Sequence, residues 1–213
     1  MAVTDQDLEK DVIYRMLENG NANAAPPALL TNMFTITEIL DSMNRVQQAF
    51  LLATGIIVTR TVIPAVAGTP KYAVPANSIR PRRLTWQDAG GNIKVLTQVD
   101  TWELDNGKPD WPSDQDVPIS WWETTLGQQQ VGIAPTPSQV GQINLLYVQL
   151  AATLTGAGVA LTVPDDWSPY ILWGTLAELL SSDGQSYDPV RAQYCSTRLA
   201  EGIELANLVL GGA

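Results

Sequence analysis

Apolar residues near both ends of the chain recur every three or four positions, the spacing of one helix face. The first such pattern starts at Thr4, carries acidic residues in its first turn and stops at Gly20. Acidic side chains there complement the positive end of the helix dipole. A second pattern starts at Thr35, which has the spacing of a capping box with Glu38, and stops at Gly55. The sequence therefore predicts two N-terminal helices.

Two more helices are predicted after residue 163. The first begins at Pro164, and its apolar residues cover most of the circumference, which is typical of a helix buried on several sides. Asp188 caps the second, with Pro189 in its first turn, where a missing N–H costs nothing. Its apolar stripe comprises Val190, Tyr194, Cys195, Leu199, Ile203, Ala206, Val209 and Leu210. Leu205 and Leu208 lie off this stripe, so the last turns are apolar on a second face.

Between these helical ends the pattern changes to short β-rich runs separated by Pro and Gly turns. Strands are predicted over residues 56–63, 71–74, 84–86, 93–99, 119–124, 130–133 and 142–150. Short strands at this spacing indicate a small sandwich or barrel. Residues 106–118 carry three prolines among acidic side chains and are interpreted as an exposed loop.

The terminal helices must pack together to bury their apolar stripes, which leaves the strand region as an insertion. The predicted fold is α+β: a helical base from the N- and C-terminal helices with an inserted small antiparallel β-domain. The expected boundaries are residues 1–54 and 164–213 for the base and 55–163 for the β-domain.

The amino-acid composition excludes several classes of functional site. The chain has 213 residues, a formal net charge of −10, no His and one Cys. These counts exclude His-based triads, His- or Cys-only zinc sites and an intrachain disulfide. The longest nearly apolar stretch, residues 49–58, is about half of what a membrane span needs. We therefore expect an acidic soluble protein made inside a cell, with no membrane contact.

Candidate chemical motifs are incomplete. Gly156-Ala157-Gly158 lacks the third glycine of a dinucleotide loop and is interpreted as a turn. Asp165-Asp166 is interpreted as helix N-terminal charge. The acidic run of residues 110–116 lacks the Gly and the final Glu of a calcium loop. We expect no enzyme activity, no cofactor and no metal.

Five tryptophans fall in the β-domain: Trp86, Trp102, Trp111, Trp121 and Trp122. Tryptophans on the strands of a small β-domain usually fill its core, and this interpretation is favoured. Exposed tryptophans could instead form a sugar-binding platform. The alternative function is therefore a carbohydrate- or receptor-binding module that depends on Trp121 or Trp122.

Charge is divided along the β-domain. Residues 71–99 are basic, with Arg80, Arg82 and Arg83 as the main cluster, and residues 100–126 carry seven acidic side chains against one Lys. The basic cluster could contact nucleic acid. It could equally meet an acidic face, either within the domain or on a neighbouring copy, as in head-to-tail ring closure. The three arginines are candidates for charges between subunits or in a lumen.

Several runs resemble the head–tail adaptor (connector) proteins of tailed bacteriophages. They are residues 163–180 (VPDDWSPYILWGTLAELL), 188–195 (DPVRAQYC), 72–86 (YAVPANSIRPRRLTW) and 133–137 (IAPTP). The resemblance covers about residues 35–207.

This resemblance implies a structural virion protein that forms a ring, commonly of about twelve copies, below the portal. The ring extends the DNA channel and docks the tail. The implied partners are other copies, the portal and tail or nozzle proteins, and the implied location is the virion neck after synthesis in the host cytoplasm. DNA passes through the lumen without specific binding, which an acidic ring favours by repulsion. Related connectors pack a C-terminal extension against the portal. The portal-docking candidates are therefore Ile203, Leu205, Leu208, Val209 and Leu210.

Overall fold

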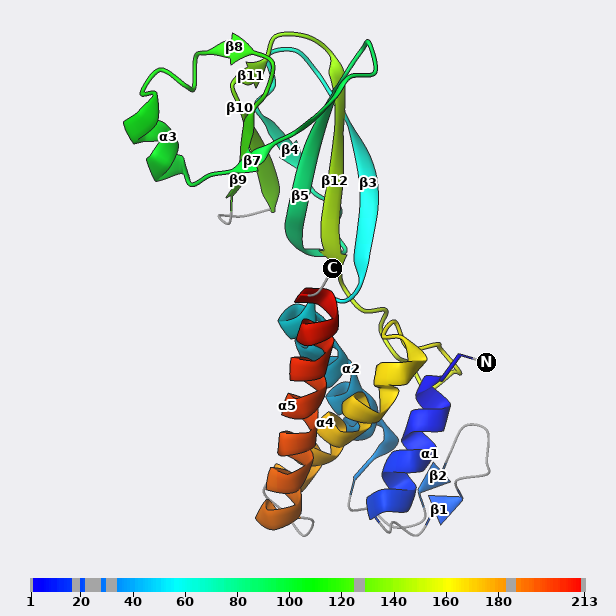
Figure 1. Cartoon of the computed structure of the whole chain (residues 1–213). Helices are drawn as coiled ribbons and strands as arrows, with labels where there is room; N and C mark the ends of the chain where they lie inside the picture. Colours follow the sequence, from blue (N-terminus) through cyan, green and yellow to red (C-terminus); the bar gives the residue numbers. More distant parts are fainter. Residues whose placement is uncertain are drawn as a thin grey trace. The chain divides into compact units, whose positions relative to one another are not determined.

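The computed structural model describes residues 2–16, 20–21, 28–29, 34–124, 129–182 and 187–211. The chain divides into two compact units (Figure 1). Unit 1 comprises Met1–Ile57 and Leu150–Ala213, and unit 2 comprises Val58–Gln149. Terminal helices thus flank a β region, and the predicted α+β fold is confirmed.

Unit 1 is helical. Its helices are α1 (Asp5–Met16), α2 (Ile36–Thr54), α4 (Ser168–Ser181) and α5 (Pro189–Gly211). Two short antiparallel strands, β1 (Gly20–Asn21) and β2 (Ala28–Leu29), accompany them. The helix predicted from Pro164 is in fact a 3₁₀ turn, η1 (Asp165–Trp167), followed by α4. The predicted stop at residues 183–184 lies outside the described residues.

The ends of α2 follow the sequence signals. The Thr35 hydroxyl accepts the N–H of Glu38 at 3.2 Å, and the Glu38 carboxylate accepts the N–H of Thr35 at 2.6 Å. This is the predicted capping box. At the other end, Gly55 adopts the left-handed conformation (φ 60°) and donates its N–H to the Leu51 carbonyl at 2.7 Å.

Side chains of α2 hold the irregular segment 150–163 in place. The Asn44 carbonyl oxygen accepts the N–H of Leu154 at 2.8 Å, and its amide donates to the Leu154 carbonyl at 3.1 Å. Gln47 accepts the N–H of Thr162 at 2.9 Å. These bonds satisfy backbone N–H and C=O groups that a strand or a helix would pair through its regular hydrogen bonds.

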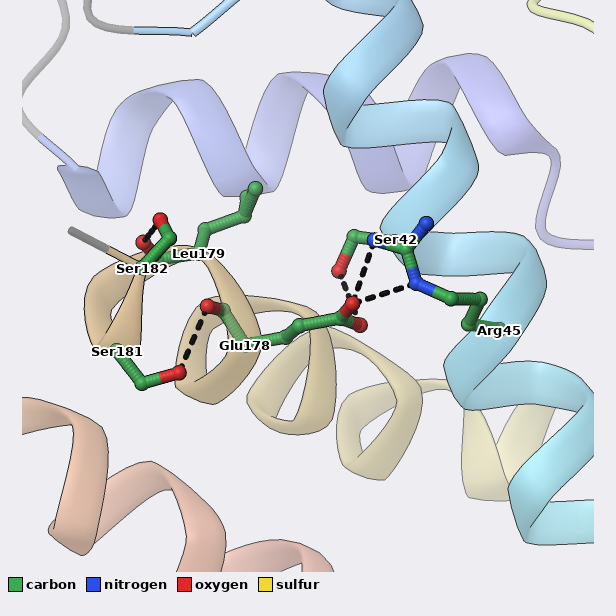
Figure 2. Close-up of polar contacts among 6 residues, drawn as sticks. All are labelled: Ser42, Arg45, Glu178, Leu179, Ser181 and Ser182. Carbon is green, nitrogen blue, oxygen red and sulfur yellow. Dashed lines mark hydrogen bonds and ion pairs between the residues drawn. The ribbon is translucent and has the colours of Figure 1, made fainter. Parts of the chain in front are cut away.

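A polar contact also joins α2 to α4. Figure 2 shows Ser42 and Arg45 reaching the Glu178 carboxylate from α2. The Ser42 hydroxyl donates to it at 2.9 Å and the Arg45 Nε at 2.5 Å. Ser42 is buried, so the hydrogen bond from its hydroxyl fixes the relation of these two helices.

Unit 2 contains two four-stranded sheets. The first has the order β3 (Val58–Ala65), β12 (Gly141–Gln149), β5 (Ser78–Asp88) and β6 (Ile93–Val95), and all its pairs are antiparallel. The second has the order β4 (Lys71–Ala73), β10 (Gln130–Ala134), β9 (Ser120–Thr124) and β7 (Thr97–Gln98). A further pair joins β8 (Gln115–Asp116) to β11 (Thr136–Pro137).

One apolar cluster fills the interior of unit 2. Its fully or nearly buried members are Ala65, Tyr72, Leu84, Trp86, Leu96, Trp121, Val131, Ile133, Ile143, Leu145 and Tyr147. They come from both sheets, so the cluster lies between the two sheets.

Three strand expectations need correction. The single strand predicted over residues 93–99 is two strands, because β6 and β7 join different sheets with buried Leu96 between them. The sheets are not wholly antiparallel, since β7 pairs with β9, and β8 with β11, in parallel. The predicted loop 106–118 contains β8 and the end of a helix, α3 (Thr101–Gly107). The α3 start was missed although Glu103 accepts the N–H of Asp100 at 3.2 Å, half of a capping box.

Candidate interaction surfaces

Helix α5 packs against α4 through small side chains. Its buried positions are Ala192, Cys195, Gly202 and Ala206. A Cβ at Gly202 would lie 2.3 Å from the Tyr170 ring of α4, so the two helices approach closely only because this residue is glycine. The predicted stripe was therefore wrong for Val190 and Val209, which are exposed. Two larger side chains of the stripe also contact α4: Tyr194 meets the Trp173 ring edge-on at 5.8 Å, and the half-buried Leu199 lies beside Gly174.

The C-terminal turns of α5 expose an apolar surface. Leu208 is 72% exposed and Val209 66% exposed, and Leu205 is also exposed, whereas Ile203 is half-buried. The side chain of Leu210 lies outside the described residues. Neighbouring exposed leucine and valine side chains on a formed helix are typical of a surface that a partner covers.

The basic cluster of β5 is divided by a bulge. Arg83 lies opposite Leu146 of β12, Pro81 lies opposite Tyr147, and Arg82 is the extra residue between them. Arg80 interacts with a carboxylate of its own unit: burial raises the pKa of Glu123, and the Arg80 charge opposes that rise. All three arginines are nevertheless exposed, because the bulge lies between the buried Pro81 and Leu84.

Arg83 also shares a sheet face with an arginine that the sequence analysis missed. Leu146 lies opposite Arg60 of β3 as well as Arg83 of β5, and side chains directly opposite one another point to the same face. Arg60 lies twenty residues before the cluster, and only the strand register brings it there. The face turned away from the apolar cluster is called here the basic sheet face, and it carries Arg60, Val62, Arg83, Val95, Asn144 and Leu146.

Most acidic residues of unit 2 lie in one segment between β7 and β9. Residues 100–118, called here the acidic arm, contain six acidic side chains and one Lys. The arm is anchored by Trp111, whose ring meets that of Trp122 edge-on at 4.7 Å and whose Nε1 donates to Asp105 at 2.7 Å. Trp102 of α3 points outward and is 71% exposed.

The tryptophans are mainly core residues. Trp86 and Trp121 are 1% exposed and belong to the apolar cluster, which confirms the core interpretation for these two. Trp122 is 3% exposed but packs against Trp111 of the acidic arm, outside that cluster. Gly132 lies opposite Trp122, and a Cβ there would meet the indole at 2.1 Å. A sugar platform built on Trp121 or Trp122 would need exposed rings. These two rings are buried, so they do not form one.

A buried acidic pair lies in unit 1. Asp5 accepts the N–H groups of Gly156 at 2.8 Å and Gly158 at 2.9 Å, and both glycines have positive φ, as the predicted turn requires. Glu9 is fully buried, and its carboxylate has no hydrogen-bond partner among the described residues. Burial, and then the neighbouring Asp5 carboxylate, raise the pKa of Glu9 to about 7.

Neither a metal site nor a membrane span is found in the part of the chain that the structure describes. No group of three or more His, Cys, Asp or Glu side chains there could hold a metal ion. No described helix is both long enough and apolar enough to cross a bilayer.

The comparison with protein families places the chain in a class of virion components. A family model described as SU10 adaptor protein matches residues 6–209. The chain belongs to this family, and the resemblance to phage head–tail adaptors is confirmed. No curated protein matches the chain. The family is one of structural phage proteins rather than enzymes.

Proposed function

We propose that the chain forms a ring of about twelve copies below the portal, where it extends the DNA channel and docks the tail. The single observation that carries this proposal, given membership of the adaptor family, is the apolar end of α5. A helix that packs its small residues inward and presents Leu205, Leu208 and Val209 outward is built to be covered by a partner. The portal is the proposed partner of this surface.

The charge of the chain supports a conduit rather than a DNA-binding site. Each copy carries a formal net charge of −10. A ring of such copies repels a passing duplex, so DNA would slide through without adhering to the wall. In this proposal the protein acts in the virion neck without catalysis, and tail or nozzle proteins bind the side of the ring away from the portal.

The test of portal docking uses the double variant Leu208→Ser and Val209→Ser. Truncation before Leu205 is a poorer choice because it removes Ala206, which is fully buried in unit 1. Both substituted side chains are exposed, so the fold should be retained. We expect co-sedimentation with the portal of the same virus to weaken by about tenfold or more, since two apolar contacts are lost.

The matched control is Val190→Ser, at the N-terminal end of the same helix and 79% exposed. It should leave portal binding unchanged. Undiminished binding by the Leu208 and Val209 variant, with its circular dichroism unaltered, would contradict the assignment of the portal contact to the end of α5.

A further inference from the structure

We infer that the acidic arm of one copy docks on the basic sheet face of the next copy, which makes this pair of surfaces the head-to-tail contact of the assembly. The inference rests on the proposed ring and names the surfaces that close it. Its occupant is a second copy of the same chain, because both complementary surfaces belong to unit 2.

The acidic arm contains a formed helix, α3, that no other part of the described chain buries. None of the seven residues of α3 is buried. So short a helix is marginal in water unless something packs on it. Its Trp102 is nevertheless held outward, at 71% exposed, by an arm that Trp111 fixes to the sheet. An exposed indole on an anchored element is typical of the buried centre of a protein interface.

The basic sheet face has the opposite charge and a matching apolar surface. Among the described residues, no carboxylate lies within ion-pair distance of Arg60 or Arg83. Leu146 lies between these two arginines, and Val62 and Val95 nearby are 48% and 54% exposed. An indole can therefore pack on aliphatic side chains while carboxylates reach the guanidinium groups.

Asn144 orients Arg60 on the same face. Its side-chain oxygen accepts a hydrogen bond from Arg60 at 2.5 Å, but its Nδ2 has no acceptor among the described residues, although the residue is only 6% exposed. A buried amide without an acceptor is costly. The Nδ2 atom is itself buried, so the contribution of Asn144 to this face is to hold the Arg60 guanidinium.

The placement of the two surfaces within unit 2 favours docking between copies. In Figure 1, α3 lies at the opposite side of this unit from β3. An arm therefore cannot reach the Arg60 and Val62 side chains of its own β3. Surfaces on opposite sides of a subunit give a heterologous contact, which generates a ring when the rotation closes.

Cysteine cross-linking tests the contact. The chain's own Cys195 is buried, and burial raises the pKa of its thiol, so it reacts slowly. Thr101→Cys and Val62→Cys place reactive thiols on the arm and on the sheet face, and the exposed Thr101 is next to Trp102, whose indole is kept. With a short bismaleimide, a mixture of the two variants should give covalent dimers, and the variant carrying both changes should give a ladder of higher multimers. The experiment is run on the chain alone and with the portal.

Tyr14→Cys, on α1 and also exposed, measures random collision. Links between Thr101→Cys and Val62→Cys no more frequent than links to Tyr14→Cys would overturn the inference. Arg83→Glu supplies a second readout: it should weaken self-association by about tenfold, whereas Lys71→Glu on β4 of the other sheet should not. Equal effects of the two variants would likewise count against the contact.

The two proposals fail separately. A chain that binds the portal through α5 but gives no link between arm and sheet face retains the proposed function and loses this inference. A chain that cross-links as expected but ignores the portal retains the contact and loses the portal assignment.

Discussion

Units 1 and 2 stabilise their interiors in different ways. In unit 1, the buried Gln47 and Asp5 and the half-buried Asn44 bind the backbone of the irregular segment 150–163. In unit 2, the interior is an almost wholly apolar cluster, and the charges lie outside it. The difference teaches that an irregular segment needs specific polar partners, whereas a sheet satisfies its own backbone and leaves its outer surface available for charge.

The largest expected effect falls on unit 2. Trp86→Ala removes an almost fully buried indole from the apolar cluster and should destabilise this unit by about 3–5 kcal/mol. Hydrogen exchange should show faster exchange of the amides of β5 and β12, while the amides of α1 and α2 keep their protection. Gly107→Ala, in the same unit but with no atom near the added methyl, is the control. Uniform loss of protection in both units would contradict separate interiors.

The next largest effect is a pH-dependent gain in stability from a substitution in unit 1. The pKa of Glu9 is about 7 in the folded chain and about 4.5 unfolded, so the folded state holds an extra proton between these values. Stability should therefore fall as pH rises from about 4.5 to about 7 and stay low above that. Glu9→Gln, which never ionises, should be more stable than the parent chain at pH 8 by up to about 3 kcal/mol.

Denaturant unfolding at pH 5 and pH 8 measures this difference. Asp11→Asn makes the same charge change on an exposed residue of α1 and should leave the pH dependence intact. A Glu9→Gln variant whose stability depends on pH as steeply as that of the parent chain would show that Glu9 is not the responsible group.

The smallest effect concerns the contact in Figure 2. The Arg45 side chain is 60% exposed in its ion pair with Glu178. Arg45→Ala should therefore cost less than about 1 kcal/mol, because water screens exposed ion pairs. Ser42→Ala should cost more, since Ser42 is buried and its loss leaves a carboxylate oxygen without its donor. Thermal unfolding of the two variants compares them, and the reverse order would contradict this account.

Local signals in the sequence predicted the long helices of unit 1 well. The Thr35 capping box and the Asp188 cap act on neighbouring residues, and the structure forms them where the pattern indicated. The predicted apolar stripe of α5 was only partly right. The pattern of hydrophobic residues does not show that the Tyr170 ring packs directly on Gly202. Close approach of two helices depends on the partner helix as much as on the pattern.

Contacts distant in sequence were the main source of error. Residues 93–99 form two strands, and Arg60 lies on the same sheet face as Arg83, because of which strands pair and in what register. Strand pairing and register cannot be predicted from a short stretch of sequence. The docking candidates on α5 and the arginines of β5 stay predictions about partners. The structure supplies the exposed surfaces on which those predictions are tested.

Native mass spectrometry of the chain, alone and with the portal of the same virus, tests the central claim most directly. The account predicts a closed complex that contains about twelve copies of the 23.1 kDa chain, formed alone or when the portal is added. A chain that remains a 23.1 kDa monomer and leaves the mass of the portal unchanged would contradict it.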